Sequence, residues 1–289
     1  MTYKEIYEMG KASLEQAGVE EAALDARILL EFVCGTNRND LFAHGEKPVA
    51  YEKKETYVNY INRRAGHIPL QHITGSQDFM GLSFQVNEKV LIPRQDTELL
   101  VEEVMLYLHD GMSILDVCTG SGCILLSLLH YSNDCRGIGV DISKEALLVA
   151  QQNCRNLKLE AEFLESDLFA VFEPDKAAGK LEKFDIIVSN PPYIETEVVE
   201  TLAEEVKDHE PVIALDGGKD GLDFYRKIAK EAGGYLTRGG MLFLEIGYNQ
   251  GEAVTKLLRE CGFRDVQLKK DYAGLDRVVF GTFLEEKHV

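Results

Sequence analysis

The sequence predicts an α/β fold, with a mostly parallel sheet between two layers of helices, preceded by a small all-helical domain and a β-hairpin. Two observations carry this prediction. Apolar residues recur every three or four positions up to about residue 73, which is typical of amphipathic helices. From residue 113 onward, short apolar strands alternate with helical segments, which favours a parallel sheet. We therefore expect a helical domain over residues 1–73, a hairpin linker over 74–95 and an α/β domain over 96–289.

The first 73 residues divide into helices at their glycines. Residues 6–14 form a loose apolar stripe that Gly18 closes, and a second stripe over residues 24–33 ends at Gly35. A longer helix should cover about residues 49–65. No segment of this part contains a catalytic pattern, so we assign it to substrate recognition.

The linker changes to a period of two, which predicts a β-hairpin. Apolar and polar residues alternate over 82–86, residues 87–88 should form the turn, and residues 90–92 the second strand. Pro93 ends this stretch, and we expect Asp96 or Thr97 to cap the helix that follows.

The remaining part predicts a sheet of seven strands. The expected strands cover residues 114–117, 137–141, 162–164, 184–189, 241–245, 265–269 and 277–283. Helices should separate most of them, which makes those strands parallel with helices on both faces. The last two strands are joined by a loop around Gly274, so this pair should be antiparallel.

Composition and charge exclude several classes of protein. The chain has 31 Lys and Arg against 49 Asp and Glu, a net charge of −18, which repels nucleic acid at long range. No apolar run approaches the ~20 residues that span a bilayer, and the N-terminus resembles no targeting peptide. The six scattered cysteines and seven histidines show no metal-binding spacing. We expect a cytoplasmic protein without a metal, a membrane or a direct nucleic-acid partner, and, since neither domain shows a dimer stripe, a monomer.

The acidic excess is densest over residues 195–210. This stretch contains six glutamates and an aspartate. The simpler interpretation is a solvated helix face, and the alternative is a docking face for a basic partner protein. The sequence leaves both open.

A cofactor site is predicted where the strand order of such a sheet reverses. The loop after the first strand contains Cys118, Thr119, Gly120, Ser121 and Gly122, and its glycines let the backbone approach a ligand. The nicotinamide fingerprint would require a further glycine where Leu125 stands, which argues against NAD.

Two further acids extend this cofactor site. Asp141 ends the second strand, where a carboxylate accepts both hydroxyls of a ribose. After the third strand, Asp167 is placed to accept the amino group of an adenine, and Leu168 to pack on its ring. An adenosyl cofactor therefore fits the pattern, although a ribose-binding acid alone does not distinguish it from a nicotinamide cofactor.

The chemistry is predicted at the end of the fourth strand, in Asn190, Pro191, Pro192 and Tyr193. The prolines fix an extended backbone and donate no N–H, so carbonyl oxygens near Asn190 and Pro191 remain free to accept hydrogen bonds. Together with the Asn190 side-chain oxygen, they are suited to hold one planar NH₂ group. Tyr193 is expected to cover a face of that group. This pattern indicates methylation of an amide or aromatic amine, with most of the rate enhancement from positioning and electrostatics.

At this point the chain resembles the HemK/PrmC family of protein-glutamine N-methyltransferases over nearly its whole length. The resemblance rests on the helical domain, the hairpin, the glycine-rich loop, the Asn190 motif and residues 92–98 and 276–278. It implies a Rossmann-like class I methyltransferase domain, S-adenosylmethionine as cofactor, and the glutamine of a Gly-Gly-Gln loop in peptide chain release factors 1 and 2 as the acceptor.

The resemblance also assigns residues. It implies that Cys118 to Gly122, Asp141, Leu168 and Asn190 line the cofactor, and that Asn190 to Tyr193 hold the glutamine. Leu168 stands where some members carry an aromatic residue, which weakens a stacking role for it. Arg94 and Glu98 belong to the family pattern, and we expect either a role in closing the linker over the cofactor or a plain hairpin-to-helix ion pair.

Three alternatives remain beside this interpretation. A glutamine methyltransferase of a large-subunit ribosomal protein is the nearest, and the long helical domain and residues 92–98 favour the release-factor enzyme over it. An N6-adenine nucleic-acid methyltransferase uses the same four-residue motif, but the charge of −18 argues against it. A non-catalytic binding protein would not need the motif beside the cofactor loops.

Overall fold

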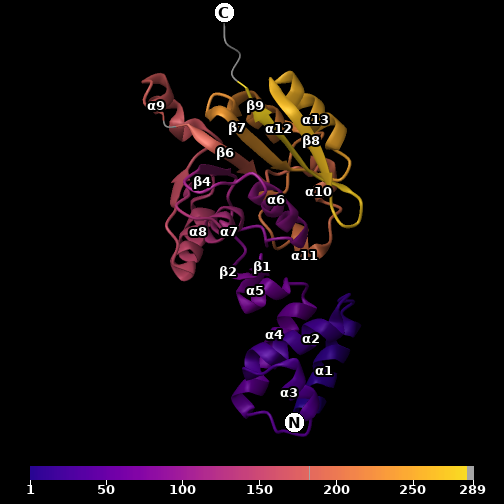
Figure 1. Cartoon of the computed structure of the whole chain (residues 1–289). Coiled ribbons are helices and arrows are strands. Elements are labelled where there is room, and N and C mark those ends of the chain that lie inside the picture. The colour runs from indigo at the N-terminus through magenta and orange to yellow at the C-terminus, as the bar shows by residue number, and fades with distance from the viewer. Residues whose placement is uncertain (182, 285–289) are drawn as a thin grey trace, which may run out of the picture. The chain divides into compact units, whose positions relative to one another are not determined.

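The computed structural model describes residues 1–181 and 183–284 (Figure 1). The chain forms two compact units. The first contains residues 1–76 together with residues 203–209, and the second contains residues 77–202 and the chain from residue 210 onward. The boundary near residue 76 lies close to the predicted end of the helical domain, whereas the inclusion of residues 203–209 could not be read from the sequence.

The first unit is a helical bundle around an apolar core. The capping box of Thr2 and Glu5 starts α1, and Gly35, with a left-handed φ of 61°, ends α2. Ile6, Leu29 and Tyr57 are completely buried between α1, α2 and α4. The helices of this unit are α1 (Tyr3–Gln16), α2 (Ala22–Cys34), α3 (Arg38–Ala43), α4 (Tyr51–Ala65), α5 (Leu70–Thr74) and α11 (Glu204–Lys207).

Residues 203–209 join this unit through an ion pair with a buried arginine. Arg64 on α4 is only 4% exposed; its Nε lies 2.6 Å from Asp25 Oδ2 and its Nη2 lies 2.5 Å from Glu205 Oε1. His67 Nε2 lies 3.6 Å from Glu204 Oε2. The acidic stretch is therefore neither one helix nor one solvated face, because several of its carboxylates have specific cationic partners. Short helices α10 (Thr196–Val199) and α11 interrupt it.

The hairpin lies earlier in the chain than predicted, because the predicted first strand over residues 82–86 is its second strand. Its strands are β1 (Ser76–Phe79) and β2 (Leu82–Gln85), and the turn is Met80–Gly81, both with positive φ. The prediction of a second strand over residues 90–92 was wrong. Val90 is apolar because it is buried against Ala146 and Val149 of α8, not because it pairs in a sheet.

The helix after the hairpin also starts earlier than predicted. It is α6 (Gln95–Met105), and its N-cap is Arg94 rather than Asp96 or Thr97. Thr97 is 2% exposed, and its hydroxyl accepts a hydrogen bond from Asn190. Thr97, which the sequence suggested as an N-cap, is therefore buried and bound to Asn190 instead.

The predicted seven-stranded sheet is confirmed, with the order β5-β4-β3-β6-β7-β9-β8. Its first five strands along the chain pair in parallel, and β9 pairs antiparallel with β7 and β8, as expected for the pair joined near Gly274. The strands are β3 (Ser113–Val117), β4 (Arg136–Asp141), β5 (Glu162–Glu165), β6 (Phe184–Ser189), β7 (Leu236–Glu245), β8 (Phe263–Lys270) and β9 (Asp276–Phe283).

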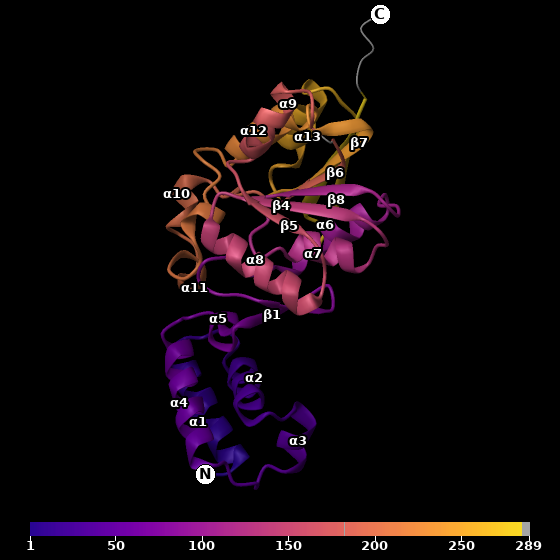
Figure 2. The same ribbon diagram turned by 90° about the vertical axis from the view of Figure 1, so that its left-hand side faces the viewer.

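Helices cover both faces of the sheet, each over its own apolar core (Figure 2). On one face lie α6, α7 (Cys123–His130) and α8 (Lys144–Leu157), and on the other lie α12 (Asp223–Ala232) and α13 (Gly251–Glu260). A 3-10 turn (Ala170–Phe172) and α9 (Glu173–Ala177) follow β5, and a second 3-10 turn (Val212–Ala214) precedes α12. Among the described residues, no helix is both long and apolar enough to cross a membrane.

The strand order places the site. The chain runs outward from β3 to β4 and β5, and then returns to the other side of β3 with β6. The carboxyl ends of β3 and β6 therefore meet where the strand order reverses, which is where ligands bind in sheets of this kind.

Candidate active site

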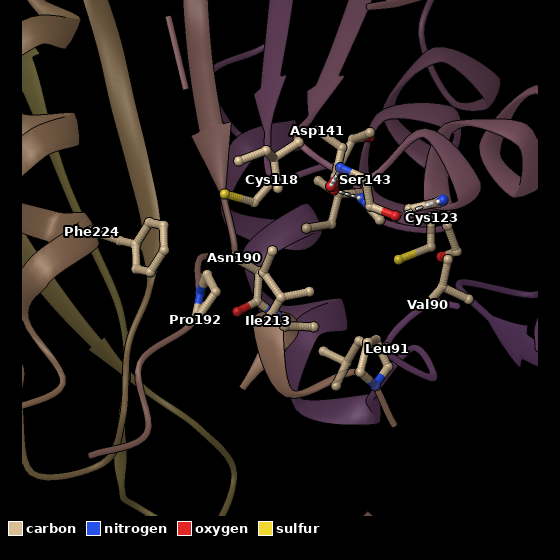
Figure 3. Close-up of a pocket in the computed structure, with 18 of the residues that line it drawn as sticks. Val90, Leu91, Cys118, Cys123, Asp141, Ser143, Asn190, Pro192, Ile213 and Phe224 are labelled. Carbon is tan, nitrogen blue, oxygen red and sulfur yellow. Dashed lines mark hydrogen bonds between the residues drawn. The ribbon is translucent and has the colours of Figure 1, made fainter. Parts of the chain in front are cut away.

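A cavity of about 280 Å³ opens at this point of the second unit. Figure 3 shows Asn190 and Pro192 in the middle of its wall, with Asp141 and Ser143 to one side and Phe224 to the other. The predicted site residues among its lining are Cys118, Thr119, Gly120, Ser121, Asp141, Asp167, Leu168, Asn190 and Pro192. Elements that are far apart in the sequence thus converge on one cavity.

The glycine-rich loop has the backbone that a close ligand requires. Gly120 has a φ of 55° and Gly122, the N-cap of α7, a φ of 78°. Cys118 adopts a φ of 61° although it has a side chain, a strained conformation typical of functional sites. Burial raises the pKa of the Cys118 thiol, which keeps it neutral and unreactive.

Asp116 and Thr119 hold this loop from beneath. Thr119 Oγ1 donates to Asp116 Oδ2 at 2.6 Å. Asp116 is completely buried, and this burial raises its pKa to about 7. It contacts the loop rather than the cavity, so its role is to support Thr119.

Asp141 is held by two backbone donors. Its Oδ2 accepts from Gly120 N and its Oδ1 from Ser143 N, each at 2.9 Å. Burial raises its pKa, and these backbone hydrogen bonds act in the opposite direction. A carboxylate oxygen accepts more than one hydrogen bond, so Asp141 is able to accept from a diol as well.

Asp167 and Leu168 complete this side of the cavity. Leu168 has a φ of 50°, and Ser166 Oγ donates to its carbonyl at 2.7 Å. A leucine in the left-handed region is strained, and the Ser166 contact fixes the turn that places both side chains on the cavity wall.

The four residues of the acceptor motif do not all face the cavity. Asn190 and Pro192 line it, whereas Pro191 and Tyr193 are not among the described lining residues. The Tyr193 hydroxyl donates to Glu245 Oε1 at 3.4 Å, and its carbonyl accepts from Gln250 Nε2 at 3.0 Å. Roles for Pro191 through its carbonyl and for Tyr193 as a cover therefore stay predictions.

Several residues that support the motif were missed in the sequence. Gln250 also accepts from Gly247 N at 2.9 Å and donates to Gly221 O at 3.2 Å, so it ties three loops together. Gly217 and Gly221 lie directly against the backbone of Tyr193. The cluster of glycines over residues 217–221 was the available signal, since glycines mark close backbone approach.

We predict that Gly217→Ala lowers turnover by up to about 100-fold through displacement of the acceptor motif. A Cβ at Gly217 would lie 2.6 Å from Tyr193 Cα and 2.8 Å from Pro192 O, which are backbone atoms that cannot swing away. Steady-state kinetics would measure this. Gly45→Ala is the control, because the nearest atom to its Cβ lies 3.6 Å away. Equal activity of the two variants would contradict the prediction.

Arg94 and Glu98 have different partners. Arg94 Nη2 lies 2.6 Å from Glu210 Oε1, and Glu98 Oε1 accepts from Met80 N at 2.6 Å. The contact between hairpin and helix is thus a hydrogen bond to the turn, not the ion pair that was one expectation. Whether Arg94 takes part in closing over the cofactor stays a prediction.

Four further residues of the cavity wall were not predicted from the sequence. Pro211, Ile213, Phe224 and Lys227 also line it. Ile213 is 54% exposed, so apolar surface faces outward at the mouth. Within the described residues no group of His, Cys, Asp or Glu is arranged to hold a metal ion.

Comparisons with known proteins agree with this geometry. Residues 5–75 match the model of the PrmC N-terminal domain, and residues 108–216 match that of a methyltransferase domain. The release factor glutamine methyltransferase of Caulobacter vibrioides is 40% identical over 98% of this chain and 96% of its own length. That of Moorella thermoacetica is 43% identical over 99% of this chain and all of its own.

Among solved structures, a methyltransferase from Pyrococcus furiosus has a TM-score of 0.52 at 18% identity, over 71% of this chain and 90% of its own. This likeness concerns the fold alone. The sequence relatives extend over both units and agree with the predicted cofactor, S-adenosylmethionine. The chain belongs to the HemK/PrmC family of release factor glutamine methyltransferases.

Proposed function

We propose that this chain methylates the side-chain amide nitrogen of the glutamine in the Gly-Gly-Gln motif of peptide chain release factors 1 and 2. The observation that carries the proposal is the position of Asn190. It stands at the end of β6, on the wall of a cavity whose other residues suit an adenosyl cofactor. The name of the relatives that match nearly the whole chain specifies the acceptor.

The cofactor would occupy the part of the cavity near β3, β4 and β5. Asp141 would accept from the ribose hydroxyls, and Asp167 from the adenine amino group. The loop from Cys118 to Gly122 would pass along the amino-acid portion. Two left-handed non-glycine residues, Cys118 and Leu168, border this part and support a built site.

Asn190 and Pro191 would prepare the acceptor nitrogen. The lone pair of an amide nitrogen is delocalised, so the nitrogen is a poor nucleophile. The Asn190 Oδ1 and the Pro191 carbonyl oxygen would each accept a hydrogen bond from the NH₂ group. These two hydrogen bonds would favour rehybridisation of the nitrogen and aim its lone pair at the methyl group. S-adenosylmethionine supplies an electrophilic methyl group on a sulfonium. Asn190 and Pro191 would hold the nitrogen for this transfer, in which an N–C bond would replace the C–S bond, the bonding electrons would stay on sulfur and the nitrogen would release one proton to water.

This proposal includes the setting of the reaction. The enzyme would act as a monomer in the cytoplasm, where its protein substrate works. A net charge of −18 disfavours the N6-adenine alternative. The ribosomal-protein alternative remains the one to exclude by experiment.

Transfer of labelled methyl groups tests the proposal. The protein would be incubated with labelled S-adenosylmethionine and a release factor, its Gln→Ala variant in the Gly-Gly-Gln motif, large ribosomal subunits, or DNA. We expect label on the unaltered release factor alone. Label on DNA or ribosomal subunits, or equal label on both release-factor forms, would overturn the proposal.

A further inference from the structure

Two buried polar groups, Thr97 and Glu245, connect to Asn190, and Thr97 is itself one of the residues that line the cavity. Asn190 Nδ2 donates a hydrogen bond to Thr97 Oγ1 at 3.3 Å. Thr97, on α6, is 2% exposed, and its hydroxyl in turn interacts with the carboxyl of Glu245 at the end of β7, where it favours the ionised form. The Tyr193 hydroxyl approaches the same carboxyl. Both ends of the acceptor motif therefore converge on Glu245.

Within the described part of the chain, Glu245 is a buried carboxyl whose two oxygens are not both paired. Its side chain is 1% exposed, and among the described residues its Oε2 has no hydrogen-bond partner of normal geometry. A buried carboxyl that is incompletely paired costs stability, and an apolar or amide side chain would avoid the cost. Its position behind the acceptor motif suggests what the carboxyl contributes.

The direction of these hydrogen bonds matters for the reaction. A hydroxyl that accepts from Asn190 Nδ2 must place its own proton elsewhere, and the facing acceptor is Glu245. An Asn190 amide fixed in this way turns its NH₂ toward Thr97 and its Oδ1 toward the opposite side. In the reverse orientation, the NH₂ group of Asn190 would face the NH₂ group of the substrate. Both groups are donors, so no hydrogen bond would form between them.

We propose that Thr97 and ionised Glu245 are positioning residues that hold the Asn190 side chain with its oxygen toward the acceptor amide. This inference rests on the proposed role of Asn190. A proton on Glu245 would reverse the chain of hydrogen bonds: Glu245 would donate to Thr97, and Thr97 to Asn190 Oδ1. The side-chain oxygen would then be occupied, and turnover would fall.

The surroundings of Glu245 place this reversal near neutral pH. Burial raises the pKa of Glu245 to about 7, and the negative charge of Asp96 on α6 acts in the same direction. Thr97, Arg277 on β9 and Tyr193 lower this pKa. Tyr225 on α12 donates to its backbone carbonyl at 3.0 Å, and Cys123 of α7 also lies near. Arg277 itself is paired with Asp96 and Asp271, at 3.1 Å and 3.0 Å, so it only partly compensates the charge.

The first test compares Thr97→Val with Thr97→Ser. Valine has the shape of threonine without the hydroxyl, and serine keeps the hydroxyl. We expect Thr97→Val to lower kcat by about 10- to 100-fold with cofactor Kd changed less than about threefold, and Thr97→Ser to restore most of kcat. Calorimetric titration with S-adenosylmethionine and methyl-transfer kinetics provide the two readouts. Full kcat in Thr97→Val would overturn the proposal.

The second test is the pH profile of kcat. The wild-type profile should rise through about pH 7 as Glu245 ionises. Glu245→Gln should have a kcat about tenfold lower at pH 8 and should lack this rise. Glu103→Gln, on the far part of α6 and paired with Lys269, is the charge-removal control and should keep it. If kcat of Glu245→Gln still rose through about pH 7, the titrating group would be Asp116 instead, and the proposal would be overturned.

The stability of Glu245→Gln separates positioning from a structural role. The raised pKa means that the fold gains from Glu245 only while it is protonated, and this contribution is lost as the pH rises through about 7. The variant should therefore melt no lower than wild type at pH 8, despite its lower kcat. Failure of the proposed function is distinguishable, because the release factor would then receive no methyl group even from the wild-type enzyme.

Discussion

Replacement of Asn190 by alanine should lower kcat by roughly 100- to 1,000-fold. The variant loses the side-chain oxygen that accepts from the substrate amide, an interaction expected to strengthen as the nitrogen rehybridises. Asn190 is also one of many residues that line the cavity, so cofactor affinity should stay within about tenfold of wild type. Single-turnover methyl transfer and calorimetric titration with S-adenosylmethionine measure the two quantities separately.

The control for this prediction is Asn59→Ala, at an exposed position of α4. It removes the same atoms outside the cavity and should leave both quantities unchanged. If Asn190→Ala instead abolished cofactor binding, Asn190 would be chiefly a cofactor ligand. If kcat were retained, the acceptor motif would not act through this side chain.

Replacement of Arg64 by alanine should destabilise the first unit by about 3–5 kcal/mol. Arg64 and Asp25 are 4% and 5% exposed, and the substitution leaves Asp25 as a buried charge without its partner. It also removes the contact with Glu205 that brings residues 203–209 into this unit. Thermal unfolding followed by circular dichroism should show an earlier transition for the helical unit.

Two further variants make this prediction specific. Arg27→Ala removes a partly exposed pair with Glu31 on α2 and should cost less than about 1 kcal/mol. Arg64→Met combined with Asp25→Asn removes both buried charges and should recover part of the lost stability. Equal effects of Arg64→Ala and Arg27→Ala would mean that the buried pair contributes no more than a surface pair.

The fold was predictable wherever local patterns decide it. The alternation of strands and helices after residue 113 predicted the seven-stranded sheet, and Gly274 predicted its antiparallel end. The hairpin shows the limit of such patterns. Residues 90–92 have the apolar character of a strand, but Val90 owes it to a contact with α8, more than fifty residues further along the chain.

The site was predictable where backbone geometry requires particular residues. Left-handed turns favour glycine, as at positions 120 and 122, and a fixed extended backbone favours proline, as at 191 and 192. The cofactor loop and the acceptor motif therefore stood out. Glu245, by contrast, looks like an ordinary polar residue at a strand end. Its burial, and its proximity to Thr97 and Tyr193, arise only when α6, β6 and β7 come together.

The role of the acidic stretch over residues 195–210 could not be predicted either, because it also depends on residues distant in the sequence. Its individual carboxylates are distinguished only by distant partners: Glu205 by Arg64 and Glu210 by Arg94. These pairs span more than one hundred residues, so no periodicity within the stretch could separate them from the carboxylates that face solvent.

The central claim is that Asn190 directs methyl transfer to one glutamine nitrogen of a release factor. Fragmentation mass spectrometry of the release factor after reaction, with wild-type enzyme and with Asn190→Ala, tests it directly. We expect one added methyl group, on the glutamine of the Gly-Gly-Gln peptide, with the wild-type enzyme, and almost none with the variant under the same conditions. A methyl group on another residue, or equal methylation by both enzymes, would contradict the claim.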